Sequence, residues 1–202
     1  MITYPTKVEV DGVVIPIDTS FKTGLRCMEV IENDGISDQE RALAIIFLLT
    51  DDIPSVNLTK LLQVLSKYLQ CGQEKVERHS NVKDMDLEQD YKYIIASFMH
   101  DYRIDLSKED MHWWRFMELL NGLSGECILN RVRDIRTMDL SIYKDAKTRE
   151  RILKARKQVA LKIKHTETEE EKEHREKFEA HFGTPSKSNQ LDDDDYLLED
   201  EE

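Results

Sequence analysis

A double-tryptophan segment decides the fold: residues 111–122 read MHWWRFMELLNG. With about 100° of rotation per residue, one apolar helical stripe contains Trp113, Phe116, Met117 and Leu120. We therefore predict a helix that opens at Ser107–Asp110, where acidic side chains suit the positive end of the helix dipole, and ends at Gly122. Trp113 is predicted to lie in the core. Trp114 is rotated by about 100° from that stripe and is the candidate partner-binding residue.

Four further helices are predicted around this segment from capping residues and apolar spacing. The first begins after Ser20, and the others begin after residues whose side chains can cap a helix N-terminus, namely Ser37, Asn57 and Asp86. In the first helix, Leu25, Met28 and Ile31 form the expected apolar face, and Gly35 marks its end. The second helix opens with a capping-box pattern that Glu40 completes.

The N-terminal stretch predicts a β-hairpin over residues 6–17. Val8 and Val10 alternate with polar residues, and Asp11–Gly12 is a typical hairpin-turn dipeptide before a second β-branched run. Pro16 removes a hydrogen-bond donor, so the second strand must be short or lie at an edge. The expected fold class is mainly α, with this small hairpin followed by a helical bundle.

The last third of the chain differs from the rest in its charge. We expect a hairpin and helical core domain over residues 1–140, a long charged helix over 141–182, and a disordered acidic tail over 183–202. Residues 131–164 contain 12 basic and 4 acidic side chains, whereas residues 165–202 contain 4 basic and 15 acidic ones. A segment so acidic and so poor in apolar residues cannot bury enough surface to fold alone.

Composition narrows the class of protein. The 202 residues carry a net charge of −12, with 35% charged and 40% hydrophobic residues, which argues against nonspecific nucleic-acid binding by the whole chain. The longest apolar run, residues 42–49, is too short to span a membrane. The N-terminus lacks the pattern of a signal peptide, so we expect a cytoplasmic protein. Cys27, Cys71 and Cys127 are widely spaced and predict free thiols rather than a disulfide framework or a zinc site.

The sequence carries no recognisable catalytic pattern. The motifs GxSxG, HExxH, GxxxxGK[ST] and GxGxxG do not occur, and His100–Asp101 and His112 have no identifiable nucleophile beside them in the sequence. His165 and His174 do not have a zinc-ligand spacing, and the run Asp192–Asp195 lacks the EF-hand pattern. We therefore expect a non-enzyme without catalytic residues, cofactor or metal.

Two charged features are candidate binding sites. The anion-binding candidates belong to the basic stretch 131–164 and are Arg131, Arg133, Arg136, Lys154, Arg156 and Lys157. A solvated face, or one neutralised by the acidic tail, is the favoured explanation for these cations. In the tail, Tyr196, Leu197 and Leu198 form a candidate partner-binding motif. We favour loose shielding of the basic stretch as the role of the tail, and the partner-binding motif is the alternative.

Segments on both sides of the double tryptophan carry a family resemblance. They are residues 90–98 (DYKYIIASF), 102–106 (YRIDL), 119–123 (LLNGL) and 133–136 (RDIR), together with the double tryptophan and its flanks. These segments resemble the "gene product fifteen" family of long-tailed phages and prophages of Gram-positive bacteria. The resemblance covers roughly residues 2–160 and does not include the acidic C-terminus.

The resemblance implies a gene beside the tape-measure gene and a role as a tail assembly chaperone in the host bacterial cytoplasm. The implied partners are the tape-measure protein, the tail-tube protein and further copies of the chain. A long helix with apolar stripes would aggregate if left bare, and helix-in-groove packing can cover such stripes. The alternatives are a nucleic-acid-binding module that uses the basic helix 131–164 and a structural component of the virion tail.

Overall fold

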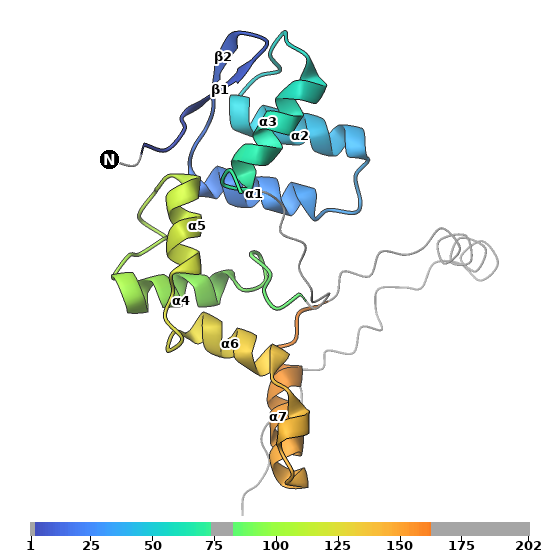
Figure 1. Cartoon of the computed structure of the whole chain (residues 1–202), viewed down its shortest axis with the longest axis vertical. Coiled ribbons are helices and arrows are strands. Elements are labelled where there is room, and N and C mark those ends of the chain that lie inside the picture. Colours follow the sequence, from blue (N-terminus) through green and yellow to red (C-terminus); the bar gives the residue numbers. More distant parts are fainter. Residues whose placement is uncertain (1–2, 74–82, 163–202) are drawn as a thin grey trace, which may run out of the picture. The chain divides into compact units, whose positions relative to one another are not determined.

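The structure is a computed structural model that describes residues 3–73 and 83–162. In these ranges the chain is mainly helical, with one hairpin before the helices (Figure 1), which confirms the predicted fold class. The helices are α1 (Phe21–Ile31), α2 (Asp38–Thr50), α3 (Leu58–Leu69), α4 (Tyr91–Tyr102), α5 (Trp113–Asn121), α6 (Ile128–Thr137) and α7 (Ala146–Gln158). The described residues belong to one compact unit that ends at Lys162. Among the described helices, none combines the length and the hydropathy that a bilayer crossing requires.

The predicted hairpin forms between β1 (Lys7–Val10) and β2 (Val13–Pro16). The strands are antiparallel, and Val8 pairs with Ile15. Asp11 and Gly12 have φ angles of 51° and 81°, which are the positive values that a tight two-residue hairpin turn requires. The buried side of the hairpin packs on α3.

The first three helices have side-chain N-caps, and the caps of α2 and α3, Ser37 and Asn57, were predicted. Ser20 Oγ accepts from the backbone N–H two residues on at 3.1 Å, and Asn57 Oδ1 accepts from the N–H three residues on at 3.0 Å. Ser37 and Glu40 form the complete capping box, in which each side chain accepts from the other's backbone N–H. Asp86 caps the turn that precedes α4 rather than α4 itself, because the helix begins at Tyr91.

An aromatic stack forms the centre of the core. Phe116 of α5 stacks on Phe21 of α1, on Phe98 of α4 and on Trp113, with ring centroids 4.9, 5.3 and 5.8 Å apart. Trp113 is 1% exposed, as predicted. Its indole Nε1 donates to the carbonyl of Leu69 at 2.9 Å, so α3 is tied to the same stack.

The buried face of α1 differs from the prediction. It consists of Phe21, Gly24 and Cys27. A Cβ at Gly24 would lie 2.2 Å from Trp113 Cε3, so the backbone of α1 packs directly on the indole. Leu25 and Met28 are consequently only partly buried, Ile31 is exposed, and the helix ends at Ile31 instead of running towards Gly35.

The predicted start of α5 is also wrong, because the helix begins at Trp113 and not at Ser107–Asp110. His112 is the N-cap, and its Nδ1 accepts from the backbone N–H two residues on at 3.0 Å. Before it, Ser20 and His112 form an antiparallel β-bridge, and the N–H of Trp113 donates to the carbonyl of Thr19 at 2.7 Å. This pairing holds the chain extended where the sequence pattern alone predicted a helix.

In the described part of the predicted helix over 141–182, the α-helix covers only residues 146–158. A 3₁₀ turn, η1 (Leu140–Ile142), precedes α7, and α7 ends at Gln158. Arg136 Nε then donates to the carbonyl of Val159 at 2.6 Å, which fixes the chain as it leaves the helix. The remainder of the predicted helix and the acidic tail lie outside the described residues.

Candidate functional site

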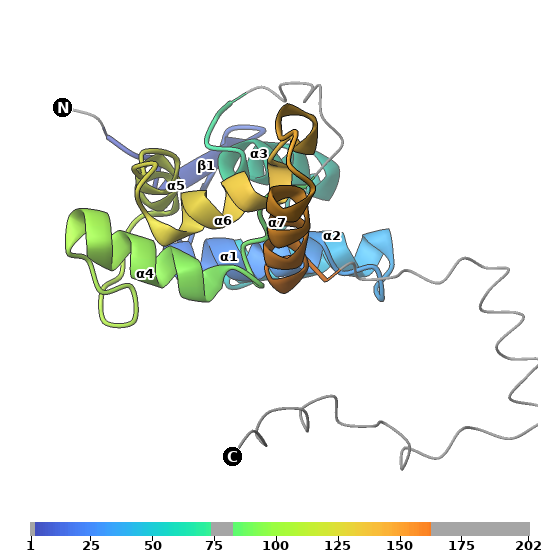
Figure 2. The ribbon, with the colours of Figure 1, turned by 90° about the horizontal axis from the view of Figure 1, so that it is seen from below.

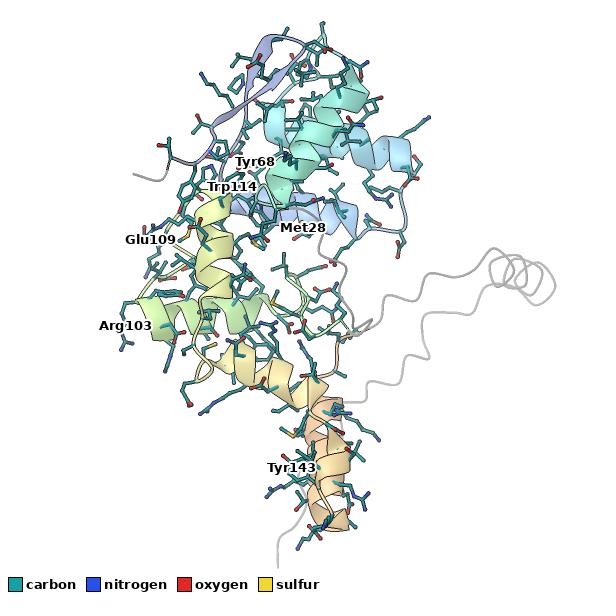
Figure 3. All side chains as sticks on the ribbon, viewed as in Figure 1. Met28, Tyr68, Arg103, Glu109, Trp114 and Tyr143 are labelled. Carbon is teal, nitrogen blue, oxygen red and sulfur yellow. The ribbon has the colours of Figure 1, made fainter. Side chains whose placement is uncertain are left out.

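A groove lies between α1 and the turn that leads into α4. We call it the α1–α4 groove; its cavity volume is about 250 Å³, and it is lined by Lys22, Leu25, Arg26, Met28, Glu29, Glu32, Leu87, Glu88 and Tyr91. The apolar members, Leu25, Met28, Leu87 and Tyr91, are each partly exposed. Figure 3 shows Met28 on α1. A cavity of this size suits side chains of a protein partner better than a drug-sized ligand, whose pockets begin at about 300 Å³.

The ends of the groove carry opposite charges. Lys22 and Arg26 lie towards the N-terminus of α1, whereas Glu29 and Glu32 lie towards its C-terminus. Glu88 adds a third carboxylate from the opposite wall. An apolar floor between charged ends favours an amphipathic helix, and the charges select its direction.

Hydrogen bonds hold the wall opposite α1 in place. Lys83 Nζ bridges Glu32 at 2.9 Å and Asp86 at 2.8 Å, which links that wall to α1. Asp86 Oδ1 in turn accepts from the backbone N–H groups of Glu88 and Gln89. Burial opposes the charge of Lys83, but its bonds to the two carboxylates raise the pKa of the ammonium. Burial likewise opposes the charge of Asp86, yet Lys83 and the two backbone donors lower the pKa of its carboxyl group.

A buried ion pair fixes α6 beneath this wall. Arg136 contacts both carboxylate oxygens of Asp90 at 2.6 and 2.7 Å, and the two side chains are 8% and 1% exposed. Arg136 also donates to the carbonyl of Asp84, and Arg133 donates to the Asp84 carboxylate. Two of the predicted anion-binding arginines are thus bound to acceptors inside the chain.

Of the other predicted anion-binding residues, one side chain points inward and three lie on the surface. Arg156 points inward and donates to the carbonyls of Ile135 and Met138. Arg131 pairs with Glu126 at 3.0 Å on the surface. Lys154 and Lys157 are exposed on α7, a helix that packs mainly on α6 (Figures 1 and 2).

Trp114 is half-buried and lies beside Tyr68 (Figure 3). Its indole Nε1 donates to the carbonyl of Tyr68 at 2.8 Å, and the two rings stack with centroids 6.1 Å apart. Gly72 has a φ of 70°, and a Cβ there would lie 3.2 Å from the Trp114 ring. The structure therefore gives Trp114 a role in holding the end of α3, and its partner-binding role stays a prediction. The motif Tyr196–Leu198 lies outside the described residues.

The histidines that sequence reasoning weighed as catalytic have structural contacts. His112 Nε2 lies 2.9 Å from the carbonyl oxygen of Pro5, besides the N-cap bond of its Nδ1. His100 Nδ1 lies 2.6 Å from Asp101, which also accepts from the N–H and hydroxyl groups of Ser124. The hydrogen bonds with His100 and Ser124 lower the pKa of Asp101. Within residues 3–73 and 83–162, no three His, Cys, Asp or Glu side chains converge as a metal site.

Sequence reasoning missed the α1–α4 groove because it assigned Leu25 and Met28 to the core. The signal that could have found it is Gly24, whose missing side chain allows Trp113 to take the buried face of α1. Leu25 and Met28 are then rotated towards the 83–90 segment.

The family resemblance is supported by direct comparison. A family model described as Bacteriophage Gp15 protein matches residues 3–161. The chain belongs to this family. The match includes the groove, the double tryptophan and α7, and makes the chain a phage structural or morphogenesis protein. No curated protein and no solved structure matches the chain.

Proposed function

We propose that this Gp15-family protein is a tail assembly chaperone that holds a helical segment of the tape-measure protein in the α1–α4 groove. The observation that carries the proposal is the groove itself. Its four apolar side chains are accessible, and Lys83, Asp86 and Arg136 hold its walls. An apolar stripe of a client helix would bury side chains at i, i+3 and i+4 against Leu25 and Met28.

Reversible coating of a long client is consistent with a small groove. A single groove of about 250 Å³ gives modest affinity per copy, and many copies along one client add to a stable coat. Tail-tube subunits can then displace the copies one by one. In this proposal the protein acts by binding in the host cytoplasm and catalyses no reaction.

The test is co-expression of the full-length chain with the tape-measure protein of the same phage, followed by affinity capture. Met28→Asp places a charge on the groove floor and should weaken capture at least tenfold, because burying one apolar side chain contributes about 1.5–3 kcal/mol. Leu87→Asp alters the opposite wall and should have the same effect. Thermal melting of each variant shows that the fold is retained.

Phe47→Asp is the matched control. Phe47 is the most exposed aromatic or aliphatic residue of α2, at 55% exposure, and does not line the groove. Its replacement should leave capture unchanged. Capture that survives both groove variants, or that fails equally in the control, would contradict the proposed binding site; no capture by the unaltered chain would contradict the proposed function.

A further inference from the structure

The α7 helix has an exposed face that nothing in the described chain covers. None of its residues is buried, and a helix that is polar on most sides is stable only with supporting contacts. Leu153 is 44% exposed. Arg149 lies one turn before it and Lys157 one turn after it, both exposed and without an ion pair among the described residues. We call Arg149, Leu153 and Lys157 the α7 row.

The chain that follows α7 lies beside the α1–α4 groove of the same copy. The backbone N–H of Lys162 donates to Gln89 Oε1 at 2.8 Å, and Gln89 Nε2 donates to the Lys162 carbonyl at 3.1 Å. Gln89 follows Glu88, which lines the groove. Arg156 and Arg136 pin the C-terminal end of α7 on α6, so the α7 row stays on the surface and does not fill its own groove.

The α7 row and the groove are complementary in chemistry. The row presents one apolar side chain between two cations. The end of the groove near the C-terminus of α1 presents apolar side chains beside Glu29, Glu32 and Glu88, whereas Lys22 and Arg26 lie at the other end. Beyond the row, α7 carries further exposed cations, whereas residues 29–40 contain five carboxylates and no basic residue. Opposite charges beside an apolar contact therefore favour docking of the row at the acidic end of the groove.

We propose that α7 of a second copy occupies the α1–α4 groove. In the resulting dimer each α7 stays packed on its own α6 and contacts the groove of the other copy. Leu153 packs on the apolar side chains of the groove. Arg149 and Lys157 form ion pairs with the glutamates that line it, which we call the rim. The groove and the chain that follows α7 are adjacent within one copy. In the proposed dimer the same contact therefore forms twice about a two-fold axis, as in most homodimers. The pair covers the groove of the free protein, and a client helix displaces α7; this last consequence rests on the proposed function.

The test measures the mass of the nuclease-treated, full-length protein by sedimentation velocity over a range of concentrations. The unaltered chain should form a dimer that weakens as salt is raised, because salt screens the exposed charge pairs. Arg149→Glu with Lys157→Glu reverses the charges of the row, and Glu29→Lys with Glu88→Lys reverses the charges of the groove's acidic end. Each double variant alone should dimerise at least tenfold more weakly.

Mixing the two double variants provides the decisive step. The acidic row of the first variant then faces the basic rim of the second. The unaltered row of the second variant faces the unaltered rim of the first, so both contacts are complementary. The mixture should therefore form a heterodimer at concentrations where each variant alone is largely monomeric. A control with the same change in net charge, Lys7→Glu with Lys67→Glu, should dimerise like the unaltered chain.

Three results would overturn the inference. The first is a full-length protein that stays monomeric at all concentrations. This holds even if a shortened protein without residues 163–202 forms a dimer. The second is a mixture that stays monomeric. The third is a monomeric protein that binds DNA or RNA through the α7 row. Client capture is measured separately, so a monomer that still captures the tape-measure protein would refute the proposed dimer and leave the proposed function standing.

Discussion

The aromatic core and the α6–α7 region are held together by different interactions. In the core, Phe21, Phe98, Trp113 and Phe116 stack in contact and are almost fully buried. In α7 no residue is buried, and guanidinium groups instead bind backbone carbonyls and the Asp90 carboxylate. Close packing resists any change of volume, whereas a bidentate ion pair depends on both partners being present.

The largest effect is expected in the aromatic core. Trp113→Ala should lower the free energy of unfolding by about 3–5 kcal/mol, as for other buried aromatic truncations. Gly24→Ala should also destabilise strongly, because the new Cβ would overlap the indole. In the Trp113→Ala background the Gly24→Ala substitution should cost little, since the obstacle is gone. Urea denaturation of the four proteins measures the coupling; additive losses would show that the two residues do not touch.

Arg136→Ala tests the second region. It leaves Asp90 buried without its partner, and loss of one member of a buried pair costs about 3–5 kcal/mol. Hydrogen exchange should increase first in α7 and residues 83–90, before the aromatic core. Arg131→Ala, which removes a surface pair with Glu126, is the control and should change stability by less than about 1 kcal/mol. Uniform loss of protection in the Arg136 variant would mean that the two regions unfold together.

Trp114→Ala should have a smaller effect than Trp113→Ala. The side chain is half-buried and donates one hydrogen bond to Tyr68, so we expect a loss of about 2 kcal/mol from burial and hydrogen bonding. Thermal denaturation compares the two tryptophan variants directly. Equal losses would show that half-burial understates the contribution of Trp114 to the core.

The smallest effect is expected from the acid titration of Asp86. Its pKa is lower in the folded protein than the value of about 3.9 for an unfolded aspartate. Its charged form therefore stabilises the fold above about pH 4, and this stabilisation is lost as the pH falls through the folded pKa. Asp86→Asn should flatten the pH dependence of stability below about pH 4. An unchanged acid limb would contradict the role of Asp86 in the groove wall.

Sequence patterns predicted the parts of the fold whose interactions are local. The Asp11–Gly12 turn and the Ser37–Glu40 capping box each involve residues within three positions of one another, and their chemistry is specific. The Trp113 stripe was also predictable, because helical periodicity places its residues on one face.

The errors arose where contacts distant in sequence overrode local preference. The bridge between Ser20 and His112 delayed the start of α5, and the indole of Trp113 at Gly24 rotated α1. The groove depends on the second of these contacts, and no single segment encodes it. The roles of Arg133, Arg136 and Arg156 were missed for the same reason, since their acceptors lie 18 to 52 residues away in the sequence.

Site-specific photo-crosslinking from the α1–α4 groove shows whether the groove contacts the tape-measure protein. A photoreactive residue replaces Arg26, which is exposed and lines the groove, and a second protein carries it at Arg115 on α5 as the control. Co-expressed with the tape-measure protein, the Arg26 position should crosslink to that protein and the Arg115 position should not. Tape-measure protein that co-purifies but crosslinks only from Arg115, or that crosslinks equally from both positions, would contradict the account.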